Sequence, residues 1–174
     1  NDEWGDLLKS YRIHGKGSNK YDNVRIGMNS RLDTLQAAIL QVKLKAFQEF
    51  ELEKANKVAD RYTKALSDLV QTPFILKNFY SSWAQYSILL KDQKDRDELK
   101  EYLGKEDIPS MIYYPKTMSQ QKAFEGMESV KTDLSIATDL SKRVLSLPLH
   151  PYMDHDEQDQ VINAIYKFLD NKKR

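Results

Sequence analysis

Apolar residues recur at every third or fourth position over residues 30–69, which is the period of a helix with one apolar face. No glycine or proline interrupts this stretch before Pro73, so the pattern predicts one long helix. Ser30, with Asp33 three positions later, is similar to a capping box and predicts that the helix begins there. The apolar positions are Leu32, Leu35, Ile39, Val42, Ala46, Phe47 and Phe50, then Val58, Tyr62, Ala65, Leu66 and Leu69.

Beyond residue 80 the pattern alternates between the strand period and the helix period. Tyr86, Ile88 and Leu90 alternate with other residues and are expected on one face of a strand. A long helix followed by the order β-α-β-α-β-α predicts an α+β domain, a small sheet layered with helices. The expected elements are a short helix over 1–12, a loop over 13–23, strands over 83–90, 108–114 and 144–147, and helices over 95–103, 132–143 and 154–170.

Composition narrows the class of protein. The 174 residues are 40% hydrophobic and 30% charged, which fits one domain, or one domain plus a fragment of another. Lys+Arg is 27 and Asp+Glu is 26, a balance that argues against a dedicated nucleic-acid or anionic-membrane binder. No apolar run approaches the length of a transmembrane helix. The chain has no cysteine, which excludes disulfides, a thiol nucleophile and cysteine-ligated zinc, and fits a cytoplasmic protein.

The first residue, Asn1, is not an initiator methionine, and the residues after it lack signal-peptide character. The opening residues also cannot form a core of their own. We therefore expect the chain to be a piece of a longer polypeptide.

Two groups of residues could in principle bind a metal or form a Schiff base, but the sequence around them disfavours both roles. His150 and His155, with the aspartates beside them, lack the spacing of a helical metal site, and Pro151 interrupts the segment. Asp154 and Asp156 are better explained as favourable charges at the start of the last helix. Lys77 stands among apolar residues, as a Schiff-base lysine does, but a strand lysine whose ammonium reaches water explains the pattern better.

Residues 27–33 have the sequence GMNSRLD and place Asn29, Ser30 and Arg31 at the start of the long helix. Free N–H groups and the helix dipole favour an anion at such a position. An asparagine amide and a guanidinium both donate hydrogen bonds to phosphate or carboxylate. Ordinary capping of the helix explains the residues equally well.

Residues 27–40, GMNSRLDTLQAAIL, and the Lys43-Leu44 pair after them resemble the signature of the DegT/DnrJ/EryC1/StrS aminotransferases. Three further stretches, 14–21, 108–124 and 145–151, are similar to later family motifs in the same order. The resemblance covers nearly the whole chain. Tyr113 and Ser119 depart from it, since many members have histidine at these two positions.

The resemblance implies the C-terminal part of a fold-type-I pyridoxal-phosphate enzyme. Residues 1–29 would end the large domain, and 30–174 would form the small domain, with the long connecting helix and then a small, mostly antiparallel sheet with helices packed on it. The implied reaction transfers an amino group, usually from glutamate, to a keto group of a nucleotide-linked sugar, for polysaccharide or glycan precursors. The implied assembly is a homodimer with shared active sites.

The resemblance also implies roles for individual residues. Asn29 would bind the phosphate of the pyridoxal phosphate in the partner subunit's site. No catalytic residue and no metal ligand is expected here, because the family's cofactor lysine lies upstream. Substrate contacts are expected from Lys20, Tyr21, Arg31, Tyr113 and Tyr114.

Neighbours on a strand point to opposite faces, so only one of Tyr113 and Tyr114 should reach the substrate. Tyr113 stands at the position where many family members have histidine, so the resemblance favours Tyr113. Two other functions stay open at this point. One is a dehydratase of the same family that uses the same cofactor. The other is a non-catalytic module that binds partners through the long amphipathic helix.

Overall fold

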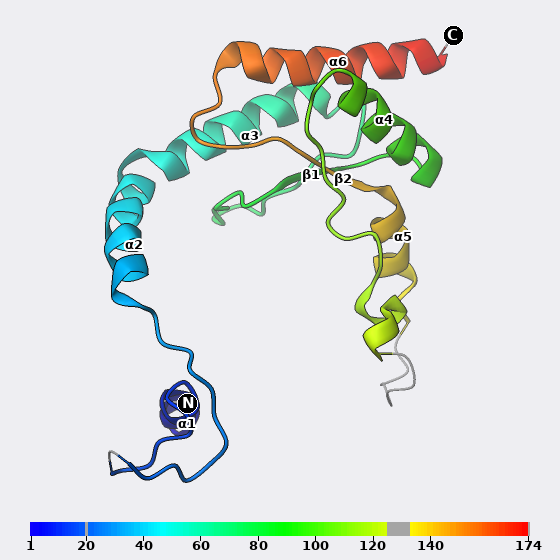
Figure 1. Cartoon of the computed structure of the whole chain (residues 1–174). Coiled ribbons are helices and arrows are strands. Elements are labelled where there is room, and N and C mark those ends of the chain that lie inside the picture. Colours follow the sequence, from blue (N-terminus) through cyan, green and yellow to red (C-terminus); the bar gives the residue numbers. More distant parts are fainter. Residues whose placement is uncertain (20, 125–132, 174) are drawn as a thin grey trace. The chain divides into compact units, whose positions relative to one another are not determined.

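The structure, a computed structural model, describes residues 1–19, 21–124 and 133–173. Contacts divide the chain into two compact units, Asn1–Gln48 and Glu49–Arg174. Both are drawn in Figure 1, coloured along the sequence. The predicted division into a large-domain segment 1–29 and a small domain 30–174 rests on the family resemblance and stays a prediction.

The first unit contains α1 (Asp2–Tyr11) and α2 (Thr34–Ala46). The short first helix was expected, but the predicted start of the long helix at residue 30 is wrong. Asp33 is the N-cap, because its side chain accepts a hydrogen bond of 2.8 Å from the Gln36 N–H. Ser30 lies outside the helix and its N–H donates to the Arg12 carbonyl oxygen instead.

The helical backbone continues past α2 through a π-helical turn, Phe47–Glu51, into α3 (Leu52–Leu66). The sequence pattern predicts an unbroken helix to residue 69, and the structure differs in both respects. The interruption comes at residues 47–51, and the helix ends at Leu66. A π-helical turn contains one residue more than an α-helical turn, and no glycine or proline is needed to form it.

Helix α2 has no buried residue, although it is rich in apolar side chains. Leu35 is 73% exposed and Val42 is 72% exposed, and both belong to the predicted apolar face of the helix. A helix that is apolar on most sides is normally covered by protein. Its exposed large apolar residues are Leu35, Ile39, Leu40, Val42 and Leu44.

The second unit is built on a two-stranded antiparallel sheet of β1 (Tyr86–Leu89) and β2 (Val144–Leu147). Ser87 lies opposite Ser146, and their hydroxyl oxygens are 2.8 Å apart. Each strand has one further neighbour through a single bridge. Leu89 exchanges backbone hydrogen bonds with Gln71, and Ser146 exchanges them with Met111.

Two predicted strands are therefore shorter than the sequence pattern indicates. The predicted strand over 108–114 is reduced to the bridge at Met111, because only this residue exchanges backbone hydrogen bonds with β2. The predicted strand over 83–90 is reduced to its last part, β1. The predicted strand over 144–147 is confirmed with the same bounds.

Helices α4 (Gln93–Lys105), α5 (Ser135–Arg143) and α6 (His155–Lys173) complete the unit. Two short 3₁₀ turns, Met118–Gln120 and Lys122–Phe124, precede α5. The helices were expected, but α4 continues one residue past Gly104. Thr132, the expected first residue of α5, lies outside the described residues. No helix among the described residues has the length and apolar character needed to span a membrane.

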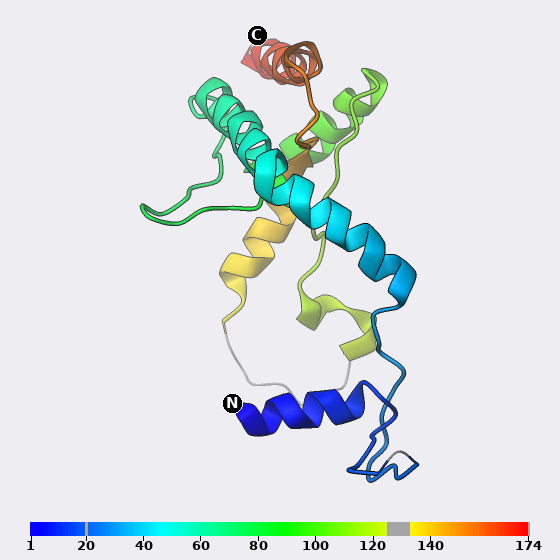
Figure 2. The same ribbon diagram turned by 90° about the vertical axis from the view of Figure 1, so that its left-hand side faces the viewer.

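The core of the second unit lies between the sheet and helices α3, α4 and α6, with α3 against α6 and α4 against both α5 and α6 (Figures 1 and 2). Tyr86, Ile88 and Leu90 are buried together, which confirms the predicted strand face. The predicted apolar face of α6 is also confirmed. The largest fully buried side chains are Tyr62, Leu66, Tyr86, Ile88, Leu99, Leu103, Leu145 and Ile165.

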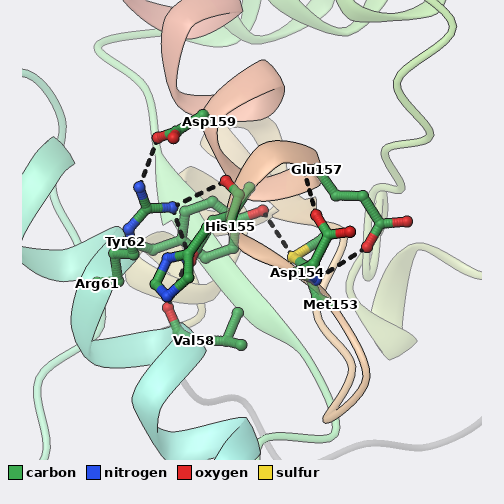
Figure 3. Close-up of polar contacts among 9 residues, drawn as sticks. Val58, Arg61, Tyr62, Met153, Asp154, His155, Glu157 and Asp159 are labelled. Atoms are coloured by element: carbon green, nitrogen blue, oxygen red, sulfur yellow. Dashed lines mark hydrogen bonds and ion pairs between the residues drawn. The ribbon is translucent and has the colours of Figure 1, made fainter.

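Polar contacts join α3 to the start of α6 (Figure 3). Arg61 donates to the Asp159 carboxylate at 2.6 Å and to the His155 carbonyl oxygen at 3.3 Å. The Tyr62 hydroxyl donates to the Pro148 carbonyl oxygen at 3.0 Å. Burial is the main cause that raises the pKa of Tyr62, so the hydroxyl keeps its proton and remains a donor.

Candidate functional site

Residues 13–31 belong to the first unit and include four of the six predicted site residues, namely Lys20, Tyr21, Asn29 and Arg31. This segment folds back on the end of α1 through backbone pairing. The Met28 N–H donates to the Tyr11 carbonyl oxygen at 2.9 Å, and the His14 N–H donates to the Met28 carbonyl oxygen at 3.0 Å. Ile13 and Asn29 form an antiparallel bridge. The pairing fixes the backbone of Asn29 from both sides.

Two glycines allow this segment to pack so closely. Gly15 has a φ of +74°, and a Cβ there would lie 1.8 Å from the Arg25 carbonyl oxygen. A Cβ on Gly27 would lie 2.2 Å from the Gly15 nitrogen. Only glycine fits both positions without a shift of backbone. These contacts give Gly15, in the stretch 14–21, and Gly27, in the stretch 27–40, a structural role.

Replacing Gly15 with alanine should open this segment. The new Cβ must move the Arg25 carbonyl, and the left-handed backbone is unfavourable for alanine, so we expect a loss of about 1–3 kcal/mol in local stability. Hydrogen exchange of the Val24 and Met28 amides measures it, because the Val24 N–H donates to the Gly15 carbonyl oxygen. Gly5→Ala is the matched control, since nothing lies within 4 Å of a Cβ there. Equal exchange in both variants would contradict the prediction.

Ser10 and Arg25 support the same segment, and the sequence analysis did not identify either. The Ser10 hydroxyl is buried, donates to the Lys16 carbonyl oxygen at 2.6 Å and accepts from Arg25 Nη1 at 2.5 Å. The Arg25 guanidinium also lies 5.8 Å from the centroid of the Tyr11 ring. Neither the apolar periodicity nor a sequence motif identifies Ser10 and Arg25, because their hydrogen-bond partners come from a loop.

The side chains of Asn29 and Arg31 are in contact. Arg31 Nε donates to Asn29 Oδ1 at 3.1 Å, and both side chains are exposed. The bond occupies the only acceptor of the Asn29 side chain and leaves its amide N–H groups without a protein partner in the part of the chain that the structure describes. The terminal N–H groups of the Arg31 guanidinium likewise have no protein partner among the described residues. The pair therefore presents hydrogen-bond donors and one positive charge, which suits phosphate or carboxylate.

The physical origin of this arrangement differs from the one that the sequence indicates. Because α2 begins at Thr34, Asn29 does not stand at the helix mouth, and the Asp33 carboxylate occupies that place. A carboxylate at the helix N-terminus repels a second anion. Any anion at Asn29 and Arg31 is therefore held by their side chains and not by the helix dipole.

Tyr21 belongs to the same unit and is 88% exposed. Lys20, the other predicted contact in this loop, lies outside the described residues. The proposed contact of Tyr21 with substrate rests on the resemblance.

Tyr113 and Tyr114 belong to the second unit and differ in exposure. Tyr113 is partly buried and lines a cavity of about 180 Å³ with residues that include Gln85, Ser110 and Ser146. Tyr114 is 68% exposed, and its ring lies edge-on to that of Tyr113, with centroids 5.6 Å apart. Neither lies in a strand, so the expected alternation of faces does not apply. Tyr113 faces a hollow and Tyr114 faces outward.

The structure also locates Lys77 and Asp154, for which the sequence disfavours a chemical role. Lys77 lies exposed in a turn and not in a strand, so it lacks the burial that activates a Schiff-base lysine. Asp154 caps α6, since it accepts from the Glu157 N–H at 2.8 Å while Glu157 accepts from the Asp154 N–H at 3.0 Å (Figure 3). Among the described residues, no three His, Asp or Glu side chains lie close enough together to hold a metal ion.

Comparison with known proteins identifies the family. Residues 1–166 match the DegT/DnrJ/EryC1/StrS aminotransferase family. The chain belongs to this family. The match covers α1, the loop with Asn29 and Arg31, both strands and most of α6, so the predicted family and fold class are confirmed.

Individual members of the DegT/DnrJ/EryC1/StrS family are similar over nearly the whole chain. A Pseudomonas aeruginosa UDP-2-acetamido-2-deoxy-3-oxo-D-glucuronate aminotransferase is 36% identical over 88% of this chain and 41% of its own length. The crystal structure of a family aminotransferase from Brucella abortus is 45% identical, with a TM-score of 0.88, over 97% of this chain and 44% of its own. NtdA from Bacillus subtilis, solved with bound cofactor PMP, is 25% identical with a TM-score of 0.80, over 92% of this chain and 38% of its own. The chain thus spans less than half the length of these relatives.

Proposed function

We propose that the whole protein is a pyridoxal-phosphate-dependent aminotransferase that transfers an amino group, usually from glutamate, to a keto group of a nucleotide-linked sugar. The observation that carries the proposal is the family match over residues 1–166, together with relatives named for this chemistry. The product would serve polysaccharide or glycan precursors. A cytoplasmic location and a homodimer with shared active sites belong to the same proposal.

The residues present fit the phosphate of the cofactor. The Asn29 side chain gives its acceptor oxygen to Arg31, so its amide N–H groups remain to donate to phosphate. When bound, pyridoxal phosphate supplies the electron sink for amino-group transfer. In this proposal Asn29 reaches the partner subunit's site and holds the phosphate, while Arg31 meets the anionic part of the substrate.

Tyr113 is the residue that we place beside the sugar, with Lys20, Tyr21 and Tyr114 as further contacts. It lines a cavity, and the chain two residues before it, at Met111, bridges to β2. The interaction-module alternative loses its support, because the family match includes the long helix on which it relied.

The decisive experiment incubates the whole protein with glutamate and a UDP-linked 3-keto sugar. Mass spectrometry should show a product in which an amino group replaces the keto oxygen, together with one equivalent of 2-oxoglutarate. A product that has lost water instead would establish the dehydratase. No change in any keto sugar, with pyridoxal phosphate bound, would overturn the proposal.

Changing Tyr113 to phenylalanine in the whole protein should raise the KM for the sugar nucleotide. Loss of one hydrogen bond to substrate predicts about a threefold to tenfold effect, with little change in melting temperature. Tyr114→Phe is the matched control and should leave the KM within about twofold. A larger kinetic defect in a stable Tyr114→Phe protein would reverse the assignment.

The 174-residue chain alone should not retain pyridoxal phosphate, because the family's cofactor lysine lies upstream and Lys77 is exposed in a turn. The absorbance of the added cofactor should disappear from the protein on dialysis. A band that survives dialysis in this chain and is lost in Lys77→Ala would contradict the prediction.

A further inference from the structure

The cavity that Tyr113 lines is built around one end of the small sheet. Gln85 directly precedes β1, and Leu147 is the last residue of β2, so both stand at the same end of the antiparallel pair. The segment 109–113 supplies a further wall, and Met111 in this segment exchanges backbone hydrogen bonds with β2. All of these residues belong to the second compact unit, so the cavity is a property of this unit alone.

The cavity is uncharged. Among the described residues that line it, none is a lysine, arginine, histidine, aspartate or glutamate. Two larger cavities of the same unit differ in this respect. The one of about 760 Å³ is lined by residues that include Arg143 and Lys172, and the one of about 340 Å³ by residues that include Lys54 and Arg61. A carboxylate or phosphate in the uncharged cavity would lose water without gaining a cation from its walls, so the cavity suits an uncharged group.

Three side chains of the cavity have hydrogen-bonding groups that are available to a ligand. The Gln85 amide and the hydroxyls of Ser110 and Tyr113 have no hydrogen-bond partner within residues 1–19, 21–124 and 133–173. Ser146 also lines the cavity, but its hydroxyl is paired with that of Ser87 at 2.8 Å. Of the three available groups, the glutamine amide alone presents an N–H donor and a carbonyl acceptor on separate atoms, side by side.

Apolar side chains form the rest of the wall, and they include Pro109, Met111 and Leu149. A hydroxyl group is about the size of a water molecule, whose share of liquid volume is about 30 Å³. The cavity, at about 180 Å³, therefore has room for a substituent of several heavy atoms. Its apolar wall suits a substituent that ends in a methyl group.

We propose that this cavity takes an acylamino substituent of the sugar, and that Gln85 is the specificity-determining residue for it. The Gln85 side chain donates to the acyl oxygen and accepts from the N–H of the substituent, a pair of hydrogen bonds between two amides. The acyl methyl group packs against the apolar wall, and the hydroxyls of Ser110 and Tyr113 remain for the hydroxyls of the sugar ring. The inference rests on the proposed function, since the ligand is the sugar of that reaction.

Ligand-observed NMR on the whole protein tests the cavity without the reaction. Free N-acetylglucosamine, glucose and glucuronate are titrated separately, and saturation transfer from the protein gives a dissociation constant for each. N-acetylglucosamine should bind about tenfold more tightly than the other two, the effect expected for one or two hydrogen bonds. Equal or tighter binding of glucose or glucuronate, or no transfer to N-acetylglucosamine, would overturn the proposal.

Gln85→Leu tests whether this residue causes the preference. Leucine is similar to glutamine in size but lacks the amide, so the affinity for N-acetylglucosamine should fall to about that for glucose. Gln85 is exposed, so the melting temperature should change little. Gln85→Glu is a second variant that keeps the shape and removes the N–H donor, and it should show the same loss.

Gln160→Leu is the matched control, because Gln160 is exposed on α6 and does not line the cavity. It should keep the full preference for N-acetylglucosamine. A preference that survives in both Gln85 variants, or that falls equally in Gln160→Leu, would overturn the proposal.

The outcome is separate from that of the proposed reaction, because the three free sugars carry no keto group to be aminated. A protein that prefers N-acetylglucosamine through Gln85 but aminates no keto sugar would overturn the proposed reaction and not the sugar site. A protein that aminates keto sugars equally well with and without an acylamino group would retain the proposed reaction and overturn this inference.

Discussion

Replacing Leu145 with alanine is expected to lower the free energy of unfolding by about 2–5 kcal/mol. Leu145 is fully buried in β2, where it packs in the core of the second unit. The change removes apolar contacts and leaves a cavity in a region that cannot collapse freely around it. Urea unfolding followed by circular dichroism measures the loss.

Leu35→Ala is the control for this prediction, because Leu35 is a leucine of the same size that is 73% exposed on α2. Its effect should stay within about 0.5 kcal/mol. A loss in Leu35→Ala as large as that in Leu145→Ala would show that α2 is covered in solution. Sedimentation over a range of concentrations would then test whether a second copy of the chain provides the cover.

Replacing Asn29 with alanine in the whole protein is expected to weaken retention of pyridoxal phosphate by about tenfold or more. A hydrogen bond to a charged group contributes about 1.5–3 kcal/mol, and the Asn29 amide is proposed to donate to the phosphate. Asn29 is exposed and does not cap α2, so the melting temperature of the cofactor-free protein should change little. Equilibrium dialysis and thermal unfolding separate the two effects. Equal losses of retention and stability would contradict the assignment.

Mixed dimers test whether Asn29 acts across the subunit interface. Asn29→Ala subunits are combined with subunits that lack the cofactor lysine, and both parent dimers should be inactive. If Asn29 serves the partner subunit's site, one site of the mixed dimer keeps both native groups, and activity returns. No recovery would mean that Asn29 serves its own subunit.

The elements that pack in the core of the second unit could be predicted from the sequence, because burial of one face sets the spacing of their apolar residues. Tyr86, Ile88 and Leu90 alternate and are buried together, and α6 packs the face that its spacing predicts. For α2 the spacing predicts an apolar face, and the structure leaves every residue of the helix outside the core. Periodicity shows that a face is apolar but does not show what covers it.

The candidate site shows a similar division. The grouping of Asn29 with Arg31 could be predicted, since the two residues are neighbours in a motif. The position of the helix start could not, because Ser30 and Asp33 both have side chains that cap helices. The choice between them follows from the pairing of residues 28–30 with the end of α1. The Ser10–Arg25 and Glu51–Tyr152 contacts join residues 15 and 101 positions apart, and no local pattern encodes them.

The single bridges on either side of the small sheet have a consequence for aggregation. Gln71 and Met111 each occupy backbone groups on an outer edge, at Leu89 and Ser146. A free edge of this kind is where strands of other molecules add to form cross-β fibrils. With strands of four residues and a neighbour on each side, the sheet offers little template for such growth. Aggregation of the isolated chain should therefore proceed through the apolar side chains of α2. The aggregates should be amorphous and should not increase the fluorescence of thioflavin T.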